Sequence, residues 1–143
     1  MGNVPYQMTV VLLSSNQFMG EKSSDPFVFK RHGLNRAILD IDGLQIESNF
    51  DNNNLFGSYY RMMGSLKEPN AHLSFDQYKK TCFCLHYDLS LDSNKCHLRT
   101  VRRSNARLTL TFNESTSESI TLLAIVETPQ FAEVDQSRKV IVK

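Results

Sequence analysis

The sequence lacks the features that mark membrane and secreted proteins. It has no run of about 18 consecutive apolar residues, so we expect no helix that spans a bilayer. The N-terminus does not show the basic, then apolar, then small-residue order of a signal peptide. Only three cysteines are present, and without a secretion signal we expect them to be reduced thiols. The prediction is an intracellular protein that is not secreted.

The sequence also lacks an excess of either charge and any familiar catalytic motif. Lys and Arg number 16 against 15 Asp and Glu, so the net charge of +1 gives the whole chain no attraction to nucleic acid or membrane. We find no nucleophile elbow, phosphate-binding loop or zinc-protease helix motif. The acid pairs Asp40/Asp42 and Glu133/Asp135 show no sign of the buried cleft that would separate their pKa values. We therefore expect no catalysis and no cofactor.

What the sequence does contain is β-strand patterning, clearest near its C-terminal end. Residues 106–112 alternate apolar and polar side chains, which is typical of a half-buried strand. Residues 120–126 form an almost unbroken apolar run, which predicts a central strand buried on both faces. The linker 113–119 has no apolar residue. We therefore expect it to turn the chain back through water, so that the two strands form a hairpin.

Shorter patterns earlier in the chain predict further strands. The Asp42-Gly43 pair predicts a tight hairpin turn, because glycine accepts positive φ without steric cost. The long polar stretch 14–26 is expected to be a loop with a role as a contact surface. The expected extended segments are residues 6–13, 27–29, 34–40, 44–47, 81–89 and 140–142.

Two segments have the signals of short helices. Apolar residues recur at helical spacing through residues 55–66. Their Tyr59, Tyr60, Met62 and Met63 form a face that either packs on the core or meets a partner. Ser74 followed by Gln77 fits a capping box, which predicts a helix over residues 75–80. With about eight strands and no alternation of strands and helices, residues 1–143 predict one all-β domain, a sandwich, barrel or jelly roll.

One strand has the composition of a metal site. Cys82, Cys84 and His86 are two residues apart, so on a strand they share one face. Together with Cys96 and His97 they could provide ligands for a tetrahedral zinc ion. The alternative is that the cysteines are buried as small hydrophobic side chains. The spacing matches no zinc knuckle, so our prediction is no bound metal.

Basic residues cluster in one place. Lys95, Arg99, Arg102 and Arg103 lie near His97 and could contact nucleic acid or an acidic partner, or form a solvated loop. A second, looser basic group has the same alternatives: Lys30, Arg31, His32 and Arg36.

Beyond these patterns, five blocks in order resemble the C-terminal half of the double jelly-roll major capsid proteins of Polinton (Maverick) transposable elements and related viruses. Residues 16–20 and 25–30 (NQFMG and DPFVFK) are similar to the family's AFNG and NPFNFK. Residues 39–43 (LDIDG) resemble LYVDG, and residues 83–92 (FCLHYDLSLD) resemble LFAFDLTPD. Residues 107–112 (RLTLTF) resemble RLEVRF. Residues 131–140 (FAEVDQSRKV) resemble a tail of the form NxIEIDxxRxV.

The sequence departs from this family in three places. Leu91 replaces a proline, and residues 128–130 (TPQ) stand where the family has acidic and aromatic residues. The segment 94–104 is shorter and more basic than the family pattern. These departures fit either a divergent capsid protein or a domesticated cellular copy.

The resemblance implies a single jelly-roll β-sandwich with a structural role. It implies side-by-side association into trimers or larger assemblies, with itself or with a second jelly roll, in a virion or inside the cell. The alternative is a domesticated jelly roll that binds another protein or nucleic acid without forming a shell. The residues expected at the oligomer contact are Phe18, Phe27, Phe29, Tyr59, Tyr60, Met63, Phe131, Glu133, Asp135 and Arg138.

Overall fold

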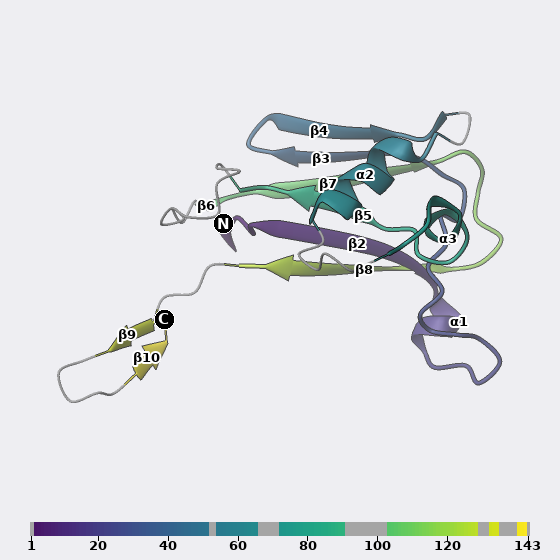
Figure 1. The fold of residues 1–143 in the computed structure, drawn as a ribbon, viewed down its shortest axis with the longest axis horizontal. Helices are drawn as coiled ribbons and strands as arrows, with labels where there is room; N and C mark the ends of the chain where they lie inside the picture. The colour runs from purple at the N-terminus through teal and green to yellow at the C-terminus, as the bar shows by residue number, and fades with distance from the viewer. Residues whose placement is uncertain are drawn as a thin grey trace.

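The computed structural model describes residues 2–51, 54–65, 72–90, 103–128, 132–134 and 140–142. It is mostly β, and its body consists of two three-stranded antiparallel sheets that pack together (Figure 1). The expected β-sandwich is therefore present at this level. None of the helices in these residues is long and apolar enough to cross a bilayer.

The first sheet has the order β5-β2-β8. Its central strand is β2 (Gln7–Ser14), which pairs with β5 (Leu85–Asp88) and along its whole length with β8 (Ile120–Glu127). The predicted strand over residues 81–89 is thus shorter than expected, although Cys82 forms an isolated bridge with Phe29. β2 is apolar on both faces, which suits a strand with neighbours on both sides.

The second sheet has the order β4-β3-β7, with β3 (Leu34–Ile41) at its centre. β3 and β4 (Leu44–Asn49) form the predicted hairpin, and β7 (Ala106–Phe112) lies on the other side. Asp42 and Gly43 have φ values of 52° and 86°. Left-handed backbone at both central residues defines the turn that matches strand twist, so the turn prediction is confirmed.

Two predictions about the C-terminal strands are wrong. β7 and β8 do not form a hairpin, because β7 pairs with β3 in one sheet and β8 pairs with β2 in the other. The seven residues 113–119 are too many for a tight turn but enough to cross the roughly 10 Å between packed sheets. Nor is β8 central and buried, since it lies at the edge of its sheet with exposed side chains on both faces.

Three helices accompany the sheets. α2 (Phe56–Ser65) and α3 (Phe75–Lys80) confirm the helices predicted from periodicity and from the capping box at Ser74. α1 (Ser15–Phe18) lies within a stretch predicted to be a loop. Its capping box pairs Ser14 with Gln17, the same Ser-x-x-Gln spacing that correctly predicted α3.

The core fills the space between the sheets and beneath α2 and α3. Leu12 of β2 and Leu39 of β3 are buried in it, next to a group of aromatic side chains around Tyr78 and Phe83. Burial raises the pKa of Tyr78, whose hydroxyl donates a hydrogen bond of 2.8 Å to the carbonyl of Cys84. That bond satisfies a buried polar group that is otherwise costly.

Two small sheets complete the described chain. β1 (Gly2–Asn3) pairs with β6 (Arg103–Ser104), and β9 (Ala132–Val134) pairs with β10 (Val140–Val142), where a final strand was predicted. The β9–β10 hairpin stands beyond the end of β8, apart from the two main sheets (Figure 1).

Candidate interaction surfaces

The strand β8 leaves apolar side chains exposed, whereas a closed sandwich would bury them. Its register with β2 places Leu122 opposite Leu12 and Val126 opposite Met8. Leu12 and Met8 are buried, whereas Leu122 and Val126 are 43% and 50% exposed. On the other face of the strand, Leu123 and Ile125 are 38% and 58% exposed. Four large apolar side chains on one strand therefore face solvent.

The segment around α1 is a second exposed apolar area. Phe18, Met19 and Phe27 are all exposed, and two of them belong to the predicted oligomer contact. Phe29, the third predicted residue here, is instead partly buried against the core. Its backbone exchanges hydrogen bonds with Thr81 and Phe83, so this end of the segment is part of the fold.

α2 divides the predicted contact residues between its two faces. Tyr59 and Met63 are packed against the core, and the Tyr59 hydroxyl donates to the Leu73 carbonyl at 2.6 Å. Tyr60 is exposed, as is Phe56, whose ring stacks on Phe75 with centroids 4.1 Å apart. The exposed face of α2 is therefore aromatic.

The remaining predicted contact residues lie in the C-terminal region or in the basic segment. Glu133 is in β9, and Arg103 is an exposed residue of β6. The others lie outside the described residues: Phe131, Asp135, Arg138, Lys95, Arg99 and Arg102.

The looser basic group is used within the fold. Arg36 of β3 forms two hydrogen bonds with the Glu47 carboxylate of β4, at 2.6 and 3.0 Å. These bonds raise the pKa of Arg36 and lower the pKa of Glu47. Arg31 donates to the Phe50 carbonyl at 3.4 Å. Arg31 and Arg36 thus have partners within the fold, as does His32, whose Nδ1 lies 3.8 Å from a Glu118 carboxylate oxygen.

The candidate metal residues differ in their burial. Cys84 and His86 are buried, and Cys82 is half-buried at the isolated bridge that precedes β5. Burial raises the pKa of Cys84 to about 11, so its thiol is protonated at neutral pH. No group of three or more His, Cys, Asp or Glu able to hold a metal ion occurs in the described part of the chain.

His86 is hydrogen-bonded within the sheet. Its Nδ1 lies 3.0 Å from the Thr9 hydroxyl, and its buried Nε2 has no hydrogen-bond partner among the described residues. Burial lowers the pKa of His86, against the opposing effect of Asp88 and Glu127. The imidazole is therefore kept neutral in the folded protein near neutral pH.

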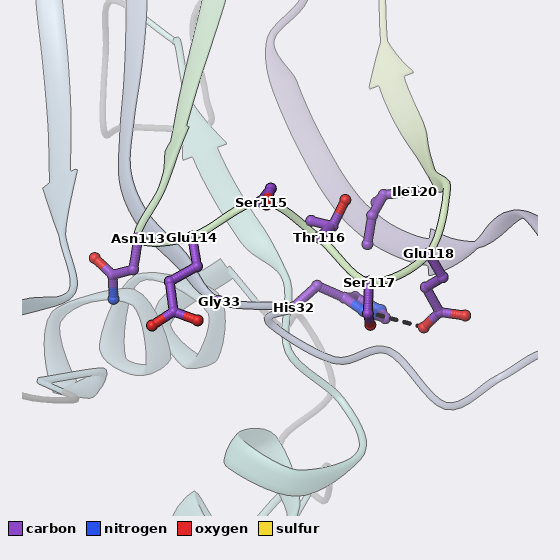
Figure 2. A pocket seen from close by; sticks show the side chains of 9 residues that line it. All are labelled: His32, Gly33, Asn113, Glu114, Ser115, Thr116, Ser117, Glu118 and Ile120. Atoms are coloured by element: carbon purple, nitrogen blue, oxygen red, sulfur yellow. Dashed lines mark ion pairs between the residues drawn. The ribbon is translucent and has the colours of Figure 1, made fainter.

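A polar pocket of about 410 Å³ lies where the 113–119 linker passes His32 (Figure 2). His32 has a left-handed φ of 51°, and its Nδ1 is 3.8 Å from a Glu118 carboxylate oxygen. Its Nε2 has no hydrogen-bond partner. Burial lowers the pKa of His32, Glu118 raises it, and Lys30 lowers it further. Sequence reasoning missed this site, for which the only signals were the His-Gly pair and the hydroxyl-rich linker.

The pocket has some of the ingredients of a hydrolytic site but not its geometry. An imidazole, a carboxylate and the hydroxyls of Ser115, Thr116 and Ser117 all line it. A nucleophile needs a base within hydrogen-bond distance, and the imidazole needs an acid at similar range. Glu118 is farther than that, and His32 Nε2 has no bonded hydroxyl. In the described residues, none of these hydroxyls is hydrogen-bonded to His32 Nε2.

Comparison with known proteins adds no assignment to these surfaces. No protein-family model, no curated protein and no solved structure matches the chain.

Proposed function

We propose that this protein is a structural one that self-associates through jelly-roll contacts into trimers or larger assemblies, as a capsid-like protein of the Polinton type would. In this proposal it has no catalytic role. The two packed sheets support it by providing the layers from which a jelly roll is built.

The observation that carries the proposal is the exposed apolar strand β8. Monomeric soluble proteins rarely leave contiguous apolar patches in water, and such patches mark interaction sites. Leu122 and Val126 are exposed on one face of the strand and Leu123 and Ile125 on the other, all within five consecutive residues. In an assembly, neighbouring subunits would bury these apolar side chains, which explains why they are exposed on the single chain.

Two further exposed groups fit an assembly with more than one contact. Phe18, Met19 and Phe27 gather near α1, and Phe56 and Tyr60 lie on the outer face of α2. Aromatic residues and methionine are the types that protein interfaces favour. Several separate surfaces are what a subunit with several neighbours requires.

The test is the mass of the full chain in solution, by light scattering after size exclusion across a wide range of concentration. A mass near three times the 16.4 kDa of one chain, or a larger defined species, is the expected result. Negative-stain microscopy of that species then shows whether it is a closed, symmetric particle. A constant 16.4 kDa at every concentration contradicts the proposal.

A further inference from the structure

The outer edge of β8 is open. In the described residues, β8 pairs with β2 on one side and with no strand on the other. Ser15 N–H donates to the Ser119 carbonyl at 2.9 Å, which fixes the alternation of the ladder. Antiparallel pairs alternate between hydrogen-bonded and non-bonded, so residues 121, 123 and 125 bond to β2. Four residues direct their N–H and C=O groups to the open edge: Ile120, Leu122, Ala124 and Val126.

This edge has none of the usual protection against pairing. Natural edge strands carry lysines, prolines, bulges or short lengths that prevent another strand from adding. β8 is eight residues long with an unbroken register, and its only charged residue is Glu127 at its end. An apolar, regular edge of this kind fits another strand.

We propose that β8 pairs antiparallel with β8 of a second copy of this chain about a two-fold axis, with Ala124 opposite Ala124. The two three-stranded sheets then join as one continuous sheet in the order β5-β2-β8-β8-β2-β5. This inference rests on the self-association in the proposed function and names the surface through which it occurs.

The strand is complementary to itself in this register. Ala124 is the smallest side chain in β8 and takes the position on the axis. Leu122 of each copy lies opposite Val126 of the other, which is a favourable apolar cross-strand pair. Thr121 of each copy lies opposite Glu127 of the other, so the strand's only carboxylate meets a hydroxyl donor.

The distribution of charge favours this antiparallel orientation. The two Glu127 carboxylates lie at opposite ends of the paired strands, far from one another. A parallel pairing in register would place them side by side, and like charges directly opposite one another destabilise a sheet.

A two-fold contact alone closes as a dimer. Trimers or larger assemblies therefore need a second contact on the same subunit. The exposed aromatic residues of α2 provide one, because α2 packs beside β5, at the opposite edge of the sheet from β8. The β8 pairing is one of at least two contacts in such an assembly.

The first experiment removes the edge donor. Ala124→Pro deletes an N–H that points away from β2, so the fold keeps its ladder but the second strand cannot bond. The matched control is Gln45→Pro on β4. The hydrogen bond from Phe50 N–H to the Asn35 carbonyl shows which β4 residues bond to β3, and by this alternation the N–H of Gln45 also points away from its sheet. Light scattering and circular dichroism are measured for both variants and the natural sequence.

We expect Ala124→Pro to lose the associated species while Gln45→Pro retains it. If both variants stay folded and associate like the natural chain, the β8 contact is refuted and the proposed function stands. If the natural chain is monomeric at every concentration, both ideas fail.

A second variant decides the register, including the case in which Ala124→Pro does not fold. Residues in a hydrogen-bonded antiparallel pair have Cα atoms about 5.5 Å apart, within disulfide range. Ala124→Cys is therefore expected to give a disulfide-linked dimer on mild oxidation. Ala106→Cys, on the exposed start of β7, is the control and should give no dimer beyond that of the natural chain. No excess dimer from Ala124→Cys overturns the proposed pairing.

Discussion

β2 and β8 lie side by side, have the same length and are similarly apolar, yet one is buried and the other is exposed. Leu12 is 2% exposed, and Leu122 directly opposite it is 43% exposed. In the described part of the chain the two strands differ in their number of neighbours, because β2 has a strand on both sides and β8 has one. An apolar run therefore indicates a strand that is stable when its side chains are buried. Whether the same chain buries them depends on the position of the strand in its sheet.

The edge strand β4 of the other sheet has the features that protect an edge from pairing with another strand. Its polar and charged residues, Gln45, Glu47 and Asn49, alternate with Leu44 and Ile46, and Glu47 is held by Arg36. β8 has one polar residue, Thr121, and no charged residue before Glu127. One edge is protected with charge and the other is left apolar, which is the pattern expected if only β8 meets a second strand.

The largest expected effect compares truncations at paired positions. Leu12→Ala should lower the free energy of unfolding by about 2 to 5 kcal/mol, because it opens a cavity in the core. Leu122→Ala, across the ladder, should cost about 1 kcal/mol or less in dilute solution, where its side chain is partly in water. Urea unfolding of both variants measures the difference. Equal costs would show that another part of the same chain covers β8.

The next effect tests which way the backbone of β8 faces. Leu123→Pro should cost about 1 to 3 kcal/mol, because it removes a bond to β2 and leaves a carbonyl on β2 without its donor. Ala124→Pro removes only an outward N–H and should cost clearly less in dilute solution. Thermal unfolding at low concentration compares the two. The reverse order would mean that the alternation is shifted by one residue.

A smaller effect depends on pH and on His86. Burial lowers the pKa of this imidazole, so between its folded and unfolded pKa values the unfolded chain binds more protons. Its contribution to stability is therefore complete above about pH 6.5 and is lost as the pH falls below that value. In His86→Gln, the urea concentration at the unfolding midpoint should fall less on acidification than it does in the natural chain. The matched variant is His32→Gln, at the half-buried imidazole beside Glu118. An unchanged slope for His86→Gln contradicts the assignment.

The smallest expected effect is at the protected edge. Glu47→Gln weakens the exposed pair with Arg36, whose side chains are 46% and 44% exposed in the order Arg36 and Glu47. Exposed ion pairs contribute little and are screened by salt. The urea midpoint should fall slightly at low salt and match the natural chain at high salt. A new associated species from this variant would show that the charge on β4, in addition to its geometry, prevents pairing.

Local signals predicted most of the elements correctly. Three correct predictions depend on residues that are close together in the sequence, so a local pattern is enough to make them. They are the Asp42-Gly43 turn, the capping box at Ser74 and the periodicity of α2. α1 was missed although Ser14 and Gln17 have the same spacing as Ser74 and Gln77. The surrounding polar residues favoured a loop. A helix of one turn is too short to show the apolar periodicity that would have indicated a helix.

Pairing between distant strands could not be predicted in the same way. Residues 113–119 are polar in a hairpin and in a crossing between sheets, so composition does not distinguish the two. The apolar run of β8 predicts burial, but burial depends on a neighbour that the described chain does not provide. The His32–Glu118 pocket likewise joins segments far apart in sequence, and no local pattern indicates it.

The pairing of β2 with β8 also has a consequence for synthesis. Gln7 lies opposite Glu127, so the first long strand to leave the ribosome waits for the last strand of the same sheet. At typical translation rates that delay is on the order of ten seconds, during which the apolar β2 has an open edge. Folds dominated by such distant pairings form slowly. Expression at high density should therefore favour aggregation of nascent chains, and a lower concentration of nascent chains should raise the yield of folded protein.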